Sequence, residues 1–134
     1  MDADQHLTIA ETSERTGLSP HTLRYYERVD LLDPVERGPD GRRRYRAADL
    51  AWLGFLLRLR ITRMPIRAMQ RFAELRRRGD QSVPERLALL RAHRERAGRD
   101  LDELAAAVGA LDDKIRHYEA LADGATGRKE HRSA

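Results

Sequence analysis

Arginine side chains are concentrated in one short stretch of this 134-residue chain. The segment from Arg37 to Arg46 holds five arginines against a single acid, Asp40. A guanidinium is planar and always charged, and its fork of donors matches phosphate oxygens and base edges. The stretch therefore indicates contact with nucleic acid, although a GC-rich gene would favour arginine in the same way without any functional meaning.

The formal charge is distributed unevenly along the sequence. Residues 1–78 carry 16 basic and 11 acidic side chains, whereas residues 79–134 carry 10 and 11. A cationic first part and a nearly neutral second part predict a nucleic-acid module joined to a part with another task.

Catalytic arrangements are missing from the sequence. It has no cysteine, which excludes disulfides and thiolate chemistry, and no nucleophile–base pair, phosphate loop or HExxH motif. We expect no enzyme, no cofactor and no metal, and we interpret His93 and His117 as solvated side chains. The start MDADQHLT lacks the order of a signal peptide, and no apolar run is long enough to span a membrane, so we expect a cytoplasmic protein.

Two short helices precede the arginine-rich stretch. Thr8 and Glu11 form a capping box, and Gly17 ends the first helix. Ser19 caps the second helix, with Pro20 at its first position. Two helices joined by such a turn predict a helix-turn-helix.

The second helix has one apolar face, formed by Leu23 and Tyr26. After a helix-turn-helix turn, we interpret its remaining faces as a DNA-reading surface; the alternative is an ordinary solvated face. The candidate residues for contacts with DNA are His21, Thr22, Arg24, Tyr25 and Arg28.

Residues 34–46 predict a two-stranded wing with its tip at Pro39–Gly41, because they contain two prolines and the turn signal Asp40-Gly41. A basic hairpin beside a recognition helix can lay guanidinium groups along phosphates. The alternative is a flexible charged loop.

Two further helices follow the predicted wing. One runs over residues 48–60, and the next opens at Pro65 and closes at Gly79. We interpret the arginines at 76–78 as a C-terminal cap of that helix.

The last predicted element is a long helix from Pro84 to Ala122. Its apolar residues alternate steps of three and four over about five heptads, interrupted by Arg94. Such a heptad seam requires a partner helix, most simply its own copy. We expect the tail from Asp123 to be disordered. The predicted dimerisation residues are Leu87, Leu90, Leu101, Leu104, Val108, Leu111, Ile115 and Tyr118.

The strings IAETSERTGLSPHTLRYYERVDLL and GRRRYRAADL, followed by the long helix, resemble the MerR family of transcriptional regulators. The resemblance covers residues 7–76 in sequence and 84–122 in architecture. It implies a mainly α fold: a winged helix-turn-helix with a small two-stranded wing, two following helices and a long antiparallel coiled-coil dimerisation helix. The DNA-binding domain would span 1–78, the dimerisation helix 79–122 and the tail 123–134.

The resemblance also implies a function. Members bind promoter DNA as homodimers and distort the spacer between the −35 and −10 elements, so RNA polymerase is an indirect partner. Thr22, Arg24 and Tyr25 fall where the family's recognition helix meets DNA. In the wing, the candidate residues are Arg42, Arg43, Arg44 and Tyr45.

Two departures from the family pattern concern backbone geometry. Asp30 stands where the family usually has glycine, and aspartate can still enter the left-handed region. Arg46 occupies the usual Ser or Thr N-cap of the third helix, so that cap must come from another residue. Two other functions remain open: an accessory or nucleoid-type DNA-binding protein without effector, and a coiled-coil adaptor with a basic head.

Overall fold

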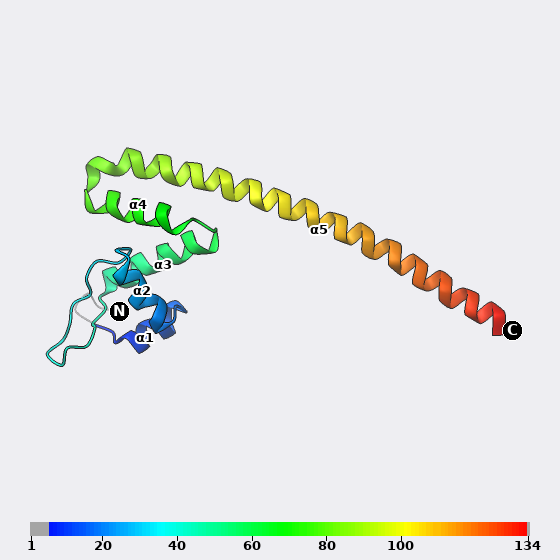
Figure 1. The fold of residues 1–134 in the computed structure, drawn as a ribbon, viewed down its shortest axis with the longest axis horizontal. Coiled ribbons are helices and arrows are strands. Elements are labelled where there is room, and N and C mark those ends of the chain that lie inside the picture. Colours follow the sequence, from blue (N-terminus) through cyan, green and yellow to red (C-terminus); the bar gives the residue numbers. More distant parts are fainter. Residues whose placement is uncertain (1–5, 134) are drawn as a thin grey trace. The chain divides into compact units, whose positions relative to one another are not determined.

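The computed structural model describes residues 6–133, and the side chains of residues 6–126. Residues 1–5 and 134, at the ends of the predicted DNA-binding domain and tail, lie outside this range. The chain divides after His93 into two compact parts. The mainly α fold class is confirmed. The elements are α1 (Ile9–Thr16), α2 (Pro20–Arg28), α3 (Ala47–Ile61), α4 (Ile66–Arg77), the short 3-10 helix η1 (Asp80–Ser82) and α5 (Val83–Ser133) (Figure 1).

The predicted signals at the ends of α1 and α2 are confirmed. The Glu11 N–H donates to Thr8 Oγ1 at 3.2 Å, and the Thr8 N–H donates to Glu11 Oε1 at 3.1 Å. Gly17 ends α1 with φ of 75°. Ser19 Oγ accepts from the Thr22 N–H at 3.1 Å. These short-range contacts set the turn between α1 and α2.

Both departures from the family pattern are resolved by local contacts. Asp30 enters the left-handed region with φ of 62°, as predicted. At the start of α3, the carboxylate of Asp49 accepts from the Arg46 N–H at 2.9 Å. The missing cap is therefore replaced by an acid one turn into the helix, where a carboxylate also interacts favourably with the helix dipole.

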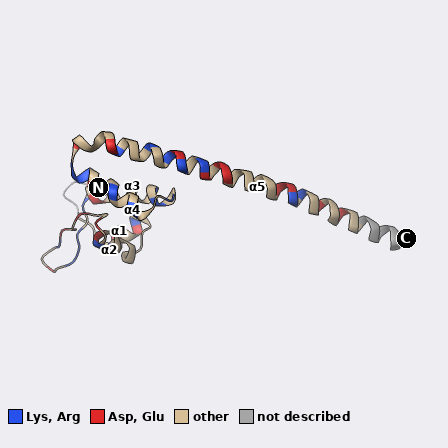
Figure 2. Ribbon diagram, turned by 45° about the horizontal axis from the view of Figure 1, so that its top comes forward, with Lys and Arg blue, Asp and Glu red and all other residues tan. Residues whose placement is uncertain are grey.

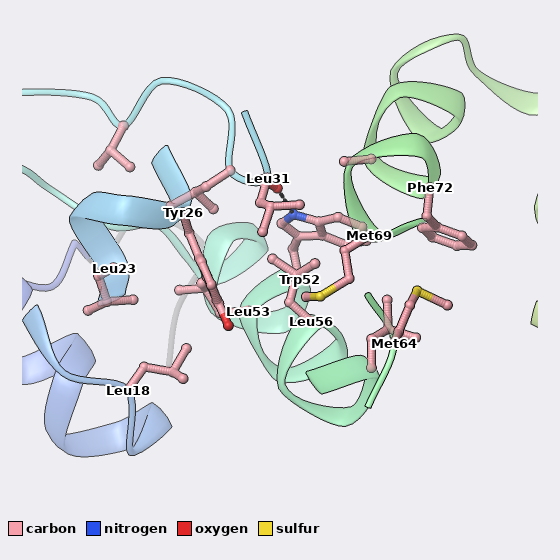
Figure 3. Close-up of a cluster of buried hydrophobic side chains, with 14 of the residues drawn as sticks. Leu18, Leu23, Tyr26, Leu31, Trp52, Leu53, Leu56, Met64, Met69 and Phe72 are labelled. Atoms are coloured by element: carbon pink, nitrogen blue, oxygen red, sulfur yellow. Dashed lines mark hydrogen bonds between the residues drawn. The ribbon is translucent and has the colours of Figure 1, made fainter. Parts of the chain in front are cut away.

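The hydrophobic core of the first part brings together α2, α3 and α4 (Figure 3). Leu23 and Leu53 are fully buried within it. The single tryptophan, Trp52, stacks on Phe72 and donates its indole N–H to the Leu31 carbonyl at 2.7 Å. This core is completed by one chain, so it holds α2 firmly without a second copy.

The first turns of α5 pack on the same core. Leu89 and Leu90 lie against it, and His93 Nε2 is 2.7 Å from Thr62 Oγ1 at the end of α3. His93 is buried, so its interpretation as a solvated side chain is wrong. Leu90, a predicted dimerisation residue, is therefore shared with the core of its own chain. This packing involves Leu89 and His93, which lie to one side of the heptad seam, together with Leu90 of the seam itself.

Beyond residue 94 the heptad seam is exposed in the single chain. Leu101, Leu111 and Tyr118 are each more than 60% exposed, and residues of both charge signs lie along this part of α5 (Figure 2). The helix continues to Ser133, past the predicted end at Ala122, where a disordered tail was expected. Helix propagation is far less costly than nucleation, so the loss of apolar periodicity does not by itself end this helix.

Candidate nucleic-acid interface

Helix α2 presents the predicted DNA-reading residues on its outer faces. Leu23 and Tyr26 point into the core, whereas His21, Arg24 and Tyr25 are exposed. The Arg28 guanidinium lies 5.7 Å from the centroid of the Tyr25 ring. The apolar pair fixes the rotation of α2, and this rotation decides which side chains reach outward.

The wing is a hairpin with very little strand pairing. The Gly41 N–H donates to the Gly38 carbonyl at 2.9 Å, and Gly41 has φ of 78°. This is a type I turn followed by a left-handed glycine, which is one of the common three-residue hairpin loops. The tip at Pro39–Gly41 is as predicted. In place of two strands, the described residues show two isolated bridges, Leu7 with Tyr45 and Arg37 with Arg43.

Side chains alternate along the returning arm of the wing, as they do in a strand. Arg42 and Arg44 are exposed, whereas Arg43 and Tyr45 turn toward the protein. Tyr45 is 0% exposed, and burial raises the pKa of its hydroxyl. The prediction that Tyr45 contacts DNA is therefore wrong, because its backbone pairs with Leu7 and its ring belongs to the core.

Glu27 joins the wing to α2, a role that sequence reasoning missed. Its Oε2 accepts from Arg43 Nε at 2.9 Å, and its Oε1 accepts from the Val35 N–H at 3.3 Å. Both side chains of the ion pair are largely buried. The spacing contained a signal, because Glu27 follows Leu23 by four residues and so shares the buried face of the helix. Arg43 thus has a partner within the protein.

A groove of about 550 Å³ separates the wing from the beginning of α1. Arg24 of α2 lines it together with Arg37, Arg42 and Arg44 of the wing, and Asp40 is the acid among the lining residues. The start of α1 forms another part of the lining, and a helix N-terminus adds partial positive charge. Arg24 of α2 and the wing arginines therefore line one cationic groove. Thr22 and Tyr25 line a separate hollow, together with Arg60 and Met64.

The three arginines at the C-terminal end of α4 contact other side chains. Arg76 stacks over the Trp52 ring at 4.3 Å, Arg77 binds Asp33 at 2.8 Å, and Arg78 binds Glu74 at 2.7 Å. Arg76 and Arg77 lie in the last turn of α4 and Arg78 is its C-cap residue, as predicted. The contacts of Arg76 and Arg77 also join α4 to other elements of the first part.

Neither a metal-binding cluster nor a membrane-spanning helix occurs in the part of the chain that the structure describes. No three His, Asp or Glu side chains described here lie close enough to hold a metal ion. Within the same residues, no helix has the length and apolar character needed to cross a membrane.

The winged arrangement agrees with comparisons to known proteins. The family model for MerR helix-turn-helix regulatory proteins matches residues 7–75. The chain belongs to the MerR family. It is 35% identical to a transcriptional regulator of Haemophilus influenzae, a match that covers 84% of this chain and 83% of the relative.

Two further regulators are similar to this chain. The HTH-type transcriptional regulator AdhR of Bacillus subtilis is 37% identical, over 67% of this chain and 64% of AdhR. The crystal structure of HiNmlR, described as a MerR family regulator that lacks the sensor domain and is bound to promoter DNA, has a TM-score of 0.79. It is 34% identical, and the alignment covers 86% of this chain and 91% of HiNmlR.

Proposed function

We propose that this MerR-family transcriptional regulator binds promoter DNA as a homodimer in the cytoplasm. The observation that carries the proposal is the cationic groove, in which Arg24 of α2 meets the exposed wing arginines. HiNmlR, which is similar over most of its length, is bound to promoter DNA in its crystal structure.

In this proposal α2 reads the bases and the wing holds the backbone. His21, Thr22, Arg24, Tyr25 and Arg28 form the reading surface. Arg42 and Arg44, which point outward, neutralise phosphates, and such contacts position a protein without carrying sequence information. Arg43 supports the wing through Glu27, because its guanidinium is already paired there.

The dimer is formed by α5. The exposed seam residues beyond position 94 have no cover within the described part of the chain, and a long helix with an a/d seam is stable when a second helix buries it. A dimer has two copies of α2, so its operator is a palindrome whose half-sites match the spacing of the two helices.

We further propose that the dimer distorts the spacer between the −35 and −10 elements, and so acts on RNA polymerase through the shape of the promoter. Bending DNA of this length requires several kcal/mol, on the order of 1–6 by elastic estimates. Two cationic grooves on one dimer supply contacts that compensate for such a deformation.

A footprint and gel shift on the DNA upstream of the chain's own gene test the proposal. Protection should be centred on the spacer, and affinity should fall by about 10³–10⁵ between about 50 and 200 mM salt if about 6–10 phosphates are neutralised. A flat salt response would exclude the cationic groove as the binding surface. Protection outside any promoter would favour an accessory or nucleoid-type protein.

A further inference from the structure

We propose that Gln70 and Arg77 of α4 position the wing for DNA binding, because they hold the segment that joins α2 to the wing. This joining segment comprises residues 29–33, which form a turn after α2 rather than a helix or strand. Both residues act through the wing and do not themselves touch DNA. The inference rests on the proposed function, in which α2 reads bases and the wing arginines bind phosphates.

Helix α4 binds the joining segment near both of its ends. Gln70 Nε2 donates to the Val29 carbonyl at 3.1 Å, where the chain leaves α2. Arg77 donates from Nη2 to the Asp30 carbonyl and from Nε to Asp33 Oδ1, the latter at 2.8 Å. A turn has no ladder of backbone hydrogen bonds to satisfy such carbonyls, so side chains of α4 do so instead.

The two donors lie on one face of α4. Gln70 and Arg77 are seven residues apart, which is close to two turns of an α-helix. Ala73 lies on the same face between them and is buried in the core. Helix α4 therefore meets the joining segment with one polar donor on each side of a buried apolar residue.

A third carbonyl of the joining segment is held by α4 indirectly. Trp52 of α3 donates its indole N–H to the Leu31 carbonyl at 2.7 Å (Figure 3). The Arg76 guanidinium lies over the Trp52 ring at 4.3 Å, and the Phe72 ring stacks on it with the two centroids 6.0 Å apart. Arg76 and Phe72 both belong to α4, so this helix also orients the indole that binds Leu31.

Asp30 gives the joining segment its change of direction. Its φ of 62° is a left-handed conformation, which is unfavourable for most residues other than glycine, although aspartate tolerates it better than most. Arg77 binds on both sides of this turn, at the Asp30 carbonyl and at the side chain of Asp33. We expect these contacts to stabilise the turn and so to fix the point at which the wing begins.

The two arms of the wing are anchored to different elements. On the returning arm, Tyr45 pairs with Leu7 and Arg43 binds Glu27. The outgoing arm follows the joining segment, and its Val35 N–H donates to Glu27. Through the joining segment, α4 anchors the outgoing arm to a second helix besides α2. A wing with looser anchors must be ordered when it binds phosphates, and this ordering lowers affinity.

Two substitutions in the full-length protein test this role. Gln70→Glu keeps the size of the side chain but leaves no donor for the Val29 carbonyl. Arg77→Ala removes both contacts of the guanidinium. In gel shifts on the promoter DNA at fixed salt, each should weaken binding roughly threefold to tenfold, the range expected for one lost hydrogen bond. Unchanged affinity in both variants would overturn the proposal.

Each substitution has a matched control close to it in the chain. Gln81→Glu adds the same charge on an exposed side chain of η1. Arg78→Ala removes the same charge as Arg77→Ala, but the partner of Arg78 is Glu74, within α4. Both controls should change affinity by less than about twofold. A control that weakened binding as much as its test variant would assign the loss to net charge and overturn the positioning role.

A comparison of two backgrounds distinguishes positioning of the wing from a general loss of stability. In a protein that carries Arg42→Ala and Arg44→Ala the outward wing charges are absent, so adding Arg77→Ala should weaken binding by no more than about twofold. In a protein that carries Arg24→Ala the wing is intact, and Arg77→Ala should keep its full effect. An equal effect in both backgrounds would overturn the positioning role.

Melting temperatures and the near-UV signal of Trp52 show whether each variant is folded. If Arg77→Ala does not fold, Gln70→Glu, which keeps the shape of its side chain, replaces it in both backgrounds. If the Arg42→Ala, Arg44→Ala protein bound DNA as tightly as the original, the wing contacts of the proposed function would be wrong, and the positioning role with them. Weaker binding by that protein, with an equal effect of Arg77→Ala in both backgrounds, would overturn the positioning role alone.

Discussion

Most leucine side chains are buried in the first part of the chain, and those in the second part are exposed. In the first part Leu53 is 0% exposed, within a core assembled from three helices. In the second part Leu101 is 65% exposed, and the seam around it continues as far as Tyr118. Burying a leucine contributes roughly 1.5–3 kcal/mol. The first part obtains this free energy from its own chain, whereas burial of the leucines in the second part would require the partner helix proposed above.

The largest expected effect is the loss of the dimer when the seam is charged. Leu104→Asp together with Leu111→Asp places unpaired carboxylates in central layers, where burial of an unpaired charge is highly unfavourable. Sedimentation should show monomers at micromolar concentration, while near-UV signals from Trp52 remain. Ala106→Asp on the outer face is the control. Dimers that persist in the double variant would show that the seam is not the interface.

Truncating a leucine should lower stability in both parts, but the effect should depend on protein concentration only in the second part. Leu53→Ala should lower the free energy of unfolding by about 2–5 kcal/mol, equally at high and low protein concentration. Leu101→Ala should lower the melting temperature more strongly as the protein is diluted, because it weakens association. Thermal melts over a hundredfold range of concentration measure both. If the effect of Leu101→Ala on the melting temperature did not depend on protein concentration, Leu101 would not contribute to association.

Arg24 should affect sequence discrimination more than general affinity. A good bidentate contact to a base is worth about 1–3 kcal/mol of discrimination, so Arg24→Ala should narrow the gap between cognate and scrambled duplexes. Arg44→Ala, which removes an exposed wing charge, should weaken both duplexes by a similar factor. Competition gel shifts at fixed salt distinguish these results. If Arg24→Ala lowered both affinities equally, Arg24 would be a phosphate contact.

The smallest expected effect concerns the contact between the wing and α2. Glu27→Gln removes the charge that pairs with Arg43 but keeps an acceptor for the Val35 N–H, so the expected loss of stability is about 1 kcal/mol. Binding should weaken equally on cognate and scrambled DNA, because a looser wing affects phosphate contacts. Glu14→Gln, on the exposed face of α1, is the control. Improved binding by Glu27→Gln would show that Arg43 is released to contact DNA.

The sequence predicted those features that depend on interactions between residues close to one another in the chain. The caps at Thr8 and Ser19 and the left-handed turns at Gly17 and Asp30 are set within a few residues, and all four are confirmed. The heptad seam was visible because a 3.5-residue period repeats over many turns.

Contacts between distant segments were not predictable in this way. Tyr45 is buried because its backbone pairs with Leu7, and no local pattern indicates that pairing. Arg43 turns inward for the same reason, since the alternation along the arm of the wing depends on the bridge to the start of α1. The continuation of α5 past Ala122 to Ser133, through Gly124 and Gly127, was not predictable because both the glycines and the loss of apolar periodicity indicate a helix end.

The number of chains on one promoter duplex tests the central claim most directly. Native mass spectrometry of the full-length protein with its own upstream DNA should give two chains per duplex and no stable complex with one chain. The Leu104→Asp, Leu111→Asp variant should lose this complex while it keeps its folded core. A complex with a single chain, of affinity equal to that of the original protein, would contradict the division of the molecule into a self-sufficient DNA-binding part and a helix that requires its copy.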